Sequence, residues 1–168
     1  ILPLSSGQRA IEAAGLRAFP FATSHDAAAS FGCRVEAPDG DALGYITDSG
    51  IVTNAAHEAL RDVRILALES NHDERMLQNG DYPYVIKQRI ASEFGHLSNP
   101  QATEELAALI TESRAAGLRM PEAVVAMHIS QNNNDYDLPR AALEKGLAIA
   151  EGNARVLCGY QGRLTSVK

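Results

Sequence analysis

ILALESNHDERMLQNGDYPYVIKQRIASEFGHLSN, residues 65–99, joins two apolar elements through a segment rich in histidine, acids and turn residues. Its first four residues form a continuous apolar run that is typical of a strand buried on both faces. Glu69, Asn71, His72 and Asp73 follow where the run stops. Because layered α/β proteins bind ligands at the C-terminal ends of their strands, this polar cluster is a candidate functional site.

The composition of the chain predicts one globular domain. It has 168 residues, of which 45% are hydrophobic, so a sizeable core can form. The net charge of −6 argues against a broad basic surface for nucleic acid, although divalent cations would restore positive charge locally. No apolar run reaches the roughly 18 residues of a membrane helix, which favours a cytoplasmic protein with no membrane partner.

Two further features are the first residue of the chain and its two cysteines. Ile1 is not an initiator methionine and stands in an apolar segment, so we expect the chain to be a piece of something longer. Cys33 and Cys158 form no CxxC pair. Lone thiols in strand-like segments are typical of small buried hydrophobic residues, and we expect no disulfide.

Hydrophobic periodicity and turn chemistry predict the remaining elements. Strands are expected at 15–21, 30–37, 43–47, 65–68, 124–127 and 155–160, with the second and third forming a hairpin. A short helix is expected at 53–60, and an amphipathic helix at 82–94 that buries Val85, Ile86, Ile90 and Phe94. Two more helices should begin at Asn99-Pro100 and at Asp137, where Asn99 and Asp137 act as N-caps.

Four polar side chains follow strands in this arrangement: His25, Asp48, His72 and His128. Strands of one sheet can bring such ends together. Two imidazoles and a carboxylate at one edge suit zinc, manganese or iron(II), and they suit catalysis where water holds an open position. His57 falls inside a predicted surface helix, so we expect it to have a structural role.

His96 differs from these residues because it precedes a predicted helix N-terminus, a position that favours an anion such as phosphate. Other chemistries have weaker support. The sequence has no GxSxG elbow, P-loop or GxGxxG, and neither cysteine has the local signature of a nucleophile. The run of asparagines at 132–134 is typical of a solvated loop.

Five motifs in order resemble the YycJ (WalJ) branch of the metallo-β-lactamase superfamily. They are Thr23-Ser24-His25-Asp26-Ala27, Ile46-Thr47-Asp48-Ser49-Gly50, Leu68-Glu69-Ser70-Asn71-His72-Asp73, Gly95-His96-Leu97-Ser98-Asn99 and His128-Ile129-Ser130. The resemblance implies an α/β fold (an αββα sandwich) with a mixed sheet flanked by helices. It also implies a metal-dependent phosphodiesterase, related to tRNase Z and associated with exonuclease action on DNA.

The resemblance further implies roles for individual residues. His25 and His128 would each be a ligand to one of two divalent metal ions, zinc or manganese, and Asp48 would bridge the two ions. His96 would be catalytic beside the scissile phosphate. Glu69, Asn71, His72, Ser98 and Asn99 would surround the metals or contact a nucleic acid substrate, which we expect to be DNA.

One departure from the family pattern matters as much as the match. The main metal motif of the superfamily, His-x-His-x-Asp-His, is absent from this sequence. Residues 1–168 therefore resemble the C-terminal half of a metallo-β-lactamase domain. We expect the N-terminal half to be the missing partner, and we expect the fragment alone to bind one metal or none and to be inactive.

Two alternatives stay open on the sequence. The first is a hydrolase of another phosphodiester or an ester on the same fold, because fold and metal site do not fix the substrate. The second is a non-catalytic half-domain that self-associates as a homodimer, or binds a partner, through the sheet face that its other half would cover.

Overall fold

A computed structural model describes residues 10–167 of the chain. The expectation about Ile1 concerns residues outside this range. The elements in order are β1 (Ile11–Ala13), β2 (Leu16–Ala22), β3 (Phe31–Glu36), β4 (Ala42–Ile46), α1 (Asn54–Leu60), β5 (Ile65–Glu69), α2 (Glu74–Asn79), α3 (Tyr84–Ile90), α4 (Asn99–Ala115), β6 (Ala123–Met127), α5 (Asp137–Ile149) and β7 (Arg155–Cys158).

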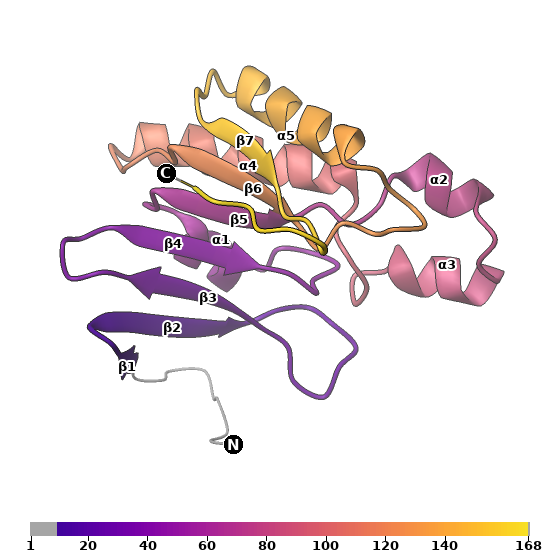
Figure 1. Cartoon of the computed structure of the whole chain (residues 1–168), viewed down its shortest axis with the longest axis horizontal. Coiled ribbons are helices and arrows are strands. Elements are labelled where there is room, and N and C mark those ends of the chain that lie inside the picture. The colour runs from indigo at the N-terminus through magenta and orange to yellow at the C-terminus, as the bar shows by residue number, and fades with distance from the viewer. Residues whose placement is uncertain (1–9, 168) are drawn as a thin grey trace.

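The strands form one mixed sheet of seven strands in sequence order, β1 to β7. The pairs from β1 to β4 are antiparallel, and the pairs from β4 to β7 are parallel. Strand β2 therefore runs in the same direction as β4, β5, β6 and β7, as the arrowheads in Figure 1 show. The loops that follow these five strands all leave the same edge of the sheet.

Helices α1, α4 and α5 cover one face of the sheet and enclose the core with it (Figure 1). Alternate residues of the central strands point into this core, as the two-residue period of a strand requires. Gly44 of β4 lies close to Leu60 of α1, and a Cβ at Gly44 would stand 2.9 Å from the Leu60 side chain. The fully buried core residues include Ile46, Leu66, Leu68, Leu106, Ile110, Val124 and Leu143.

The opposite face of the sheet is less well covered. Leu43, Tyr45, Ile65 and Leu157 are only half-buried, although strand alternation places them against that face. The segment after β7 runs back along the sheet (Figure 1), and the Thr165 hydroxyl donates to the Cys158 carbonyl. The described residues thus form one layer of helices packed on one sheet, and the other face of that sheet is partly exposed.

Helices α2 and α3 lie beyond the C-terminal ends of the strands, beside the edge where the loops converge (Figure 1). Strand β5 leads directly into α2 through residues 70–73, and α3 leads through residues 91–98 into α4. Residues 65–99 therefore surround the edge of the sheet at which the strands have their C-terminal ends.

One helix was not predicted, and another departs from its predicted bounds and burial. Helix α2 was not foreseen, although the Asp73 side chain caps it by accepting from Met76 N. The helix expected at 82–94 spans only Tyr84–Ile90, because Pro83 disfavours helical backbone at Tyr82 and the chain turns after Ala91. The proposed buried stripe is also wrong, since Val85 is 72% exposed and Phe94 is 58% exposed.

Two predicted N-caps are displaced by one or two residues. Ser98, not Asn99, caps α4 in a capping box with Gln101. Asp135, not Asp137, accepts from the first N–H groups of α5. Strands β2 to β7, the hairpin of β3 with β4 and the mixed α/β fold class are as predicted, whereas β1 was not predicted. Both cysteines are free. Within residues 10–167, no helix is long and apolar enough to cross a membrane.

Candidate metal centre

Five titratable side chains meet at the C-terminal edge of the sheet. Each follows or ends an element that fixes its backbone: His25 after β2, Asp48 after β4, Glu69 at the end of β5, His96 between α3 and α4, and His128 after β6. The sequence had placed His25, Asp48 and His128 after strands, and parallel strand direction is what brings them to one edge.

The separations between these side chains are short. Asp48 Oδ1 lies 3.9 Å from His25 Nε2, 3.9 Å from His96 Nδ1 and 3.6 Å from His128 Nδ1. The His96 ring centroid is 5.0 Å from that of His25 and 4.9 Å from that of His128. Of the four residues expected to meet, His25, Asp48 and His128 lie close together, and His96 stands between the two other imidazoles. His72 belongs to neither group of neighbouring ligand atoms, so that part of the expectation is wrong.

The hydrogen bonds of the three imidazoles share one pattern. Nδ1 of His25 donates to the Gly95 carbonyl at 3.0 Å, and Nδ1 of His96 and of His128 donate to Glu69 Oε1 at 2.9 and 2.7 Å. A carbonyl and a carboxylate only accept, so Nδ1 carries the hydrogen in each ring. In the neutral form of each ring, Nε2 then keeps a lone pair, as metal-binding histidines require.

Glu69 is the buried centre of this pattern, with 0% of its surface exposed. Its second oxygen, Oε2, accepts from Ser49 N at 2.9 Å. Burial opposes ionisation of this carboxyl, but hydrogen bonds from His128 and His96 outweigh it and lower its pKa. The same bond to Glu69 raises the pKa of His128 against the effect of its own burial. The carboxylate is therefore ionised and holds two rings at once.

The backbone is unusual at two of these residues. Asp48 has φ +55° and His128 has φ +54°, in the left-handed region that few non-glycine residues adopt. Such conformations cost on the order of 1–3 kcal/mol and persist where the surrounding structure fixes them. The left-handed residue comes directly after β6 at His128 and two residues after the end of β4 at Asp48, and it sets the direction of each side chain.

The loop that carries His96 is held by close backbone packing. A Cβ at Gly95 would lie 2.2 Å from the Ile90 carbonyl oxygen, so only glycine fits there. The loop after β2 is tied to the same region, because Asp26 N donates to the Phe94 carbonyl at 3.1 Å. Arg89 of α3 forms a two-pronged ion pair with Asp26, the residue after His25. The sequence alone gives no signal of this ion pair, because its partners are 63 residues apart.

The other predicted site residues fall into different places. Asn71 donates through Nδ2 to the His128 carbonyl at 2.7 Å, so it holds a candidate ligand in position. Ser98 caps α4, and the buried Asn99 side chain bonds Ser70 and Asn134. His72 is buried and lines a separate pocket between α2, α3 and α4. Their predicted roles toward substrate stay predictions.

A polar hollow of about 330 Å³ adjoins the cluster and is walled by His96 and His128. Neutral polar groups make up much of the remaining wall: Asn71, Tyr82, Ser130, Gln131, Asn132, Asn133 and Gln161. Asn132 donates to the Tyr82 hydroxyl at 2.8 Å, which joins the asparagine run to the segment before α3. The run at 132–134 is thus partly ordered at the site, and Asn133 and Asn134 are buried.

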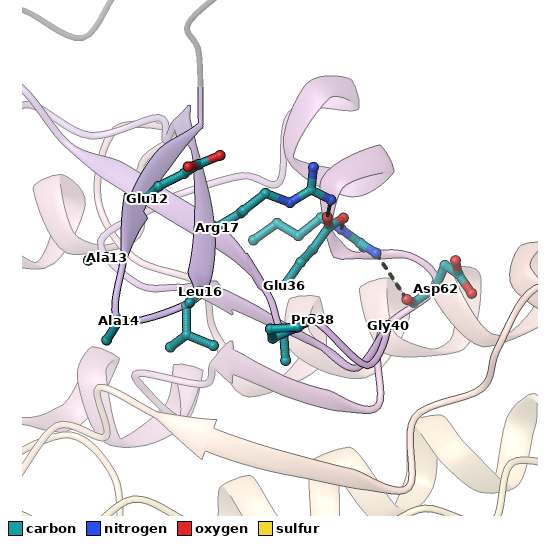
Figure 2. Close-up of a pocket in the computed structure, with 12 residues that line it drawn as sticks. Glu12, Ala13, Ala14, Leu16, Arg17, Glu36, Pro38, Gly40 and Asp62 are labelled. Atoms are coloured by element: carbon teal, nitrogen blue, oxygen red, sulfur yellow. Dashed lines mark hydrogen bonds and ion pairs between the residues drawn. The ribbon is translucent and has the colours of Figure 1, made fainter.

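A second hollow, of about 690 Å³, lies at the opposite edge of the sheet, around the β1–β2 turn (Figure 2). Its charged groups satisfy one another: Arg17 donates to Glu36 at 2.7 Å, and so does Arg34 at 2.9 Å. The Arg34 guanidinium also donates to the Asp62 carbonyl at 3.2 Å. We therefore do not assign a functional site to this hollow.

The donor atoms at the C-terminal edge fit a divalent metal. Two groups have possible ligand atoms that all lie within 4.8 Å of one another: His25, Asp48 and His96 form one, and Glu69, His96 and His128 form the other. In the second group the Nδ1 atoms of both histidines are already bonded to Glu69, which leaves their Nε2 atoms for a metal. Imidazole nitrogen and carboxylate oxygen together suit zinc and manganese. The two groups share His96. The geometry therefore makes His96 a candidate ligand, whereas the sequence predicted only a catalytic role for it.

Comparison with known proteins identifies relatives in sequence. The chain is 33% identical over 114 residues to exodeoxyribonuclease YycJ of Bacillus anthracis, which covers 65% of this chain and 40% of the relative. It is 31% identical over 131 residues to exodeoxyribonuclease WalJ of Streptococcus pneumoniae, with 78% and 46% covered. The chain thus spans less than half the length of these relatives. No protein-family model matches it.

Solved structures match the fold over nearly the whole chain. The metallo-β-lactamase fold protein YhfI of Bacillus subtilis has a TM-score of 0.59 at 15% identity, with 92% of this chain and 51% of that one covered. A diphosphatase of the PhnP family gives 0.56 at 16% identity, with 95% and 46% covered. Human tRNase Z, short form, gives 0.52 at 16% identity, with 94% and 46% covered. The resemblance drawn from the sequence is confirmed.

Proposed function

We propose that this chain, a relative of the YycJ and WalJ proteins with a metallo-β-lactamase fold, carries part of a divalent-metal site that hydrolyses phosphodiester bonds in DNA. The observation that carries the proposal is the arrangement of three imidazoles, each with Nδ1 engaged, around Asp48 and the buried Glu69. The names of the relatives, both exodeoxyribonucleases, support DNA as the substrate.

His25, Asp48 and His128 would hold the metal. When bound, divalent ions supply a hydroxide near neutral pH and stabilise charge on a phosphoryl oxygen. Glu69 keeps the Nδ1 hydrogens of His96 and His128 in place and thereby fixes which nitrogen of each ring faces outward. Asn71 holds the His128 carbonyl and so fixes the left-handed turn at that residue.

His96 would act on the substrate as a general acid. Its Nδ1 is held by Glu69 at 2.9 Å, and the ring borders the polar hollow beside the cluster. A protonated ring could donate the Nε2 hydrogen to the leaving oxygen, while the Glu69 carboxylate stabilises the positive charge. Such acid catalysis typically contributes 10²–10⁴-fold to a rate, by the general experience with positioned side chains.

The missing ligands would come from a further part of the same domain. We propose that residues 1–168 correspond to its C-terminal half, since the His-x-His-x-Asp-His motif is absent and the chain covers 40–46% of the curated relatives. The partly open sheet face, with Leu43, Tyr45 and Ile65 half-buried, suits contact with a second layer. By this proposal the present residues alone are not a complete enzyme.

Two other candidates rest on specific observations. A diphosphatase shares the fold, so the scissile bond could belong to a small phosphodiester or an ester in place of DNA. The open sheet face would equally serve a non-catalytic half-domain that pairs with a second copy.

The test uses the full natural protein, freed of metal and then titrated with Mn²⁺ or Zn²⁺. We expect metal-dependent release of nucleotides from end-labelled DNA, with slower release from RNA and little hydrolysis of small esters. Metal-independent release, or hydrolysis of esters alone, would contradict the proposal. Light scattering on the 168-residue chain tests the half-domain alternative, which requires a stable dimer without bound metal.

A further inference from the structure

His72 is a buried polar side chain without an evident structural partner. It is 1% exposed, and within residues 10–167 no hydrogen bond engages either of its ring nitrogens; Nδ1 is fully shielded from solvent as well. Its backbone, by contrast, is fixed, because its carbonyl accepts from Asn99 N at 2.8 Å. Buried polar groups are nearly always hydrogen-bonded, so an unpaired imidazole requires an explanation.

The ring borders a pocket of about 590 Å³ that α2, α3 and the start of α4 enclose. This volume is in the range of small-molecule sites. Leu77 of α2 and Ala91 after α3 supply apolar wall, while Gln78, Tyr84 and Lys87 supply polar groups around it. Glu74, Gln88, Ser98 and Gln101 complete the wall, so most of the lining side chains are polar and can hydrogen-bond a compact organic group.

The pocket is separate from the metal centre but close to it. Tyr84, Lys87, Gln88 and Ala91 recur at helical spacing and form one face of α3, whereas Ile90, on another face, borders the hollow of His96 and His128. Ser98, which lines the pocket, is two residues from His96, so their Cα atoms are at most about 7 Å apart. Residues 96–98 thus connect the cluster to the pocket.

The free polar groups of the pocket fit a nucleobase. Burial lowers the pKa of His72 to about 4, so its ring is neutral and offers one donor and one acceptor. Lys87 Nζ donates to the Gln78 backbone carbonyl at 2.8 Å, which leaves the Gln78 side-chain amide for a ligand. Glutamine amides pair with the edge of adenine. Tyr84 is 72% exposed, and its ring can stack on a base while its hydroxyl accepts from Gln88 at 2.6 Å. Lys87 keeps two ammonium hydrogens beyond its bond to Gln78, and these can meet a phosphate.

We propose that this pocket binds a nucleobase, hydrogen-bonded to His72 and Gln78 and stacked on Tyr84. The base would belong either to a nucleotide of the substrate strand near the scissile bond or to a free nucleotide. The first source rests on the proposed function; the second does not.

The experiment measures binding with the full natural protein in EDTA, so that no cleavage occurs. Fluorescence anisotropy compares a single-stranded DNA oligonucleotide with versions that carry one abasic site at each position in turn. A parallel titration follows the ring nitrogens of His72 by NMR with deoxyadenosine monophosphate. Ala91→Trp fills the pocket from an exposed position after α3, and Ala148→Trp adds the same side chain on the exposed surface of α5.

If the bound base belongs to the substrate strand, one abasic position should weaken binding of the oligonucleotide by about tenfold, the size of one lost stacking contact. Ala91→Trp should abolish this positional effect, and Ala148→Trp should keep it. A free nucleotide predicts instead a His72 nitrogen shift with the monophosphate that Ala91→Trp removes, and no positional effect on the strand. His72→Phe, which keeps a ring and removes both nitrogens, should weaken whichever ligand binds.

The proposal is overturned if no abasic position matters and the monophosphate leaves the His72 nitrogens unchanged. Hydrolysis of bis(p-nitrophenyl) phosphate with Mn²⁺ separates this failure from a failure of the proposed function. A protein that cleaves the small diester without any base effect lacks the nucleobase pocket. A protein that binds a base but cleaves no phosphodiester has the pocket without the proposed activity.

Discussion

His57 and the three histidines at the sheet edge show two opposite uses of the same side chain. On the surface between α1 and α4, His57 Nδ1 bonds Glu105 at 2.7 Å and His57 Nε2 bonds Glu112 at 3.1 Å, so both nitrogens are engaged. At the sheet edge, His25, His96 and His128 each have Nδ1 engaged by an acceptor. An imidazole with both nitrogens engaged ties elements together, and one with a spare nitrogen can bind a metal or move a proton.

The largest effect should come from Asp48→Asn. Asparagine keeps the size of the side chain and tolerates the left-handed backbone at φ +55°, but it removes the charge that faces three imidazoles. In the full natural protein we expect metal affinity to fall by more than about 100-fold, the upper range for residues that only support a ligand. Metal titration checks this, and unchanged affinity would remove Asp48 from the metal site.

His96→Ala should have the next largest effect, on turnover. We expect hydrolysis to fall about 100-fold, the size of a lost general acid, while bound metal and melting temperature stay nearly unchanged. Metal analysis and thermal unfolding accompany the rate measurement. If metal content falls together with the rate, His96 is a ligand, as its place in both donor groups would allow.

His72 should make the folded protein sensitive to acid. Burial is the main cause that lowers the pKa of His72 from 6.5 to about 4, so below pH 6.5 the unfolded chain binds a proton that the folded chain does not. The free energy of unfolding should therefore fall as the pH drops from 6.5 to 4, by about 3 kcal/mol from this residue. Chemical denaturation across this range measures it, with His72→Phe as the control that loses this contribution.

His57→Ala should have the smallest effect, and it tests whether the histidine with both nitrogens engaged has a purely structural role. Metal affinity and turnover should not change, because His57 lies with Glu105 and Glu112 on the surface between α1 and α4. Stability should fall by about 1 kcal/mol or less, the usual size of such ion pairs. A loss of metal affinity in this variant would show that the distinction between the two kinds of histidine is wrong.

The strand endings explain why much of the site could be predicted from the sequence. Apolar runs such as 65–68 and 124–127 fix where parallel strands stop, and strand direction then brings Asp48 and His128 to one edge. His57 could be set aside because it lies inside a helix. These inferences need only the period of hydrophobic residues and the topology of a parallel sheet.

The interactions that could not be predicted depend on side-chain packing over long sequence separations. Glu69 bonds His96 and His128 from 27 and 59 residues away, and Arg89 bonds Asp26 from 63 residues away. The short helix α2 was missed because its cap, Asp73, stands inside the polar cluster that was interpreted as site chemistry. Local signals of turns and caps cannot distinguish a capping carboxylate from a functional one.

The most direct test of the central claim is a crystal structure of the full natural protein grown with Mn²⁺ or Zn²⁺, with anomalous scattering used to locate the ion. We predict an anomalous peak at the C-terminal edge of the sheet, about 2.0–2.2 Å from Nε2 of His25 or His128, with an Asp48 oxygen as a further ligand. No peak at this edge, or a peak only at His57 with Glu105 and Glu112, would contradict the account.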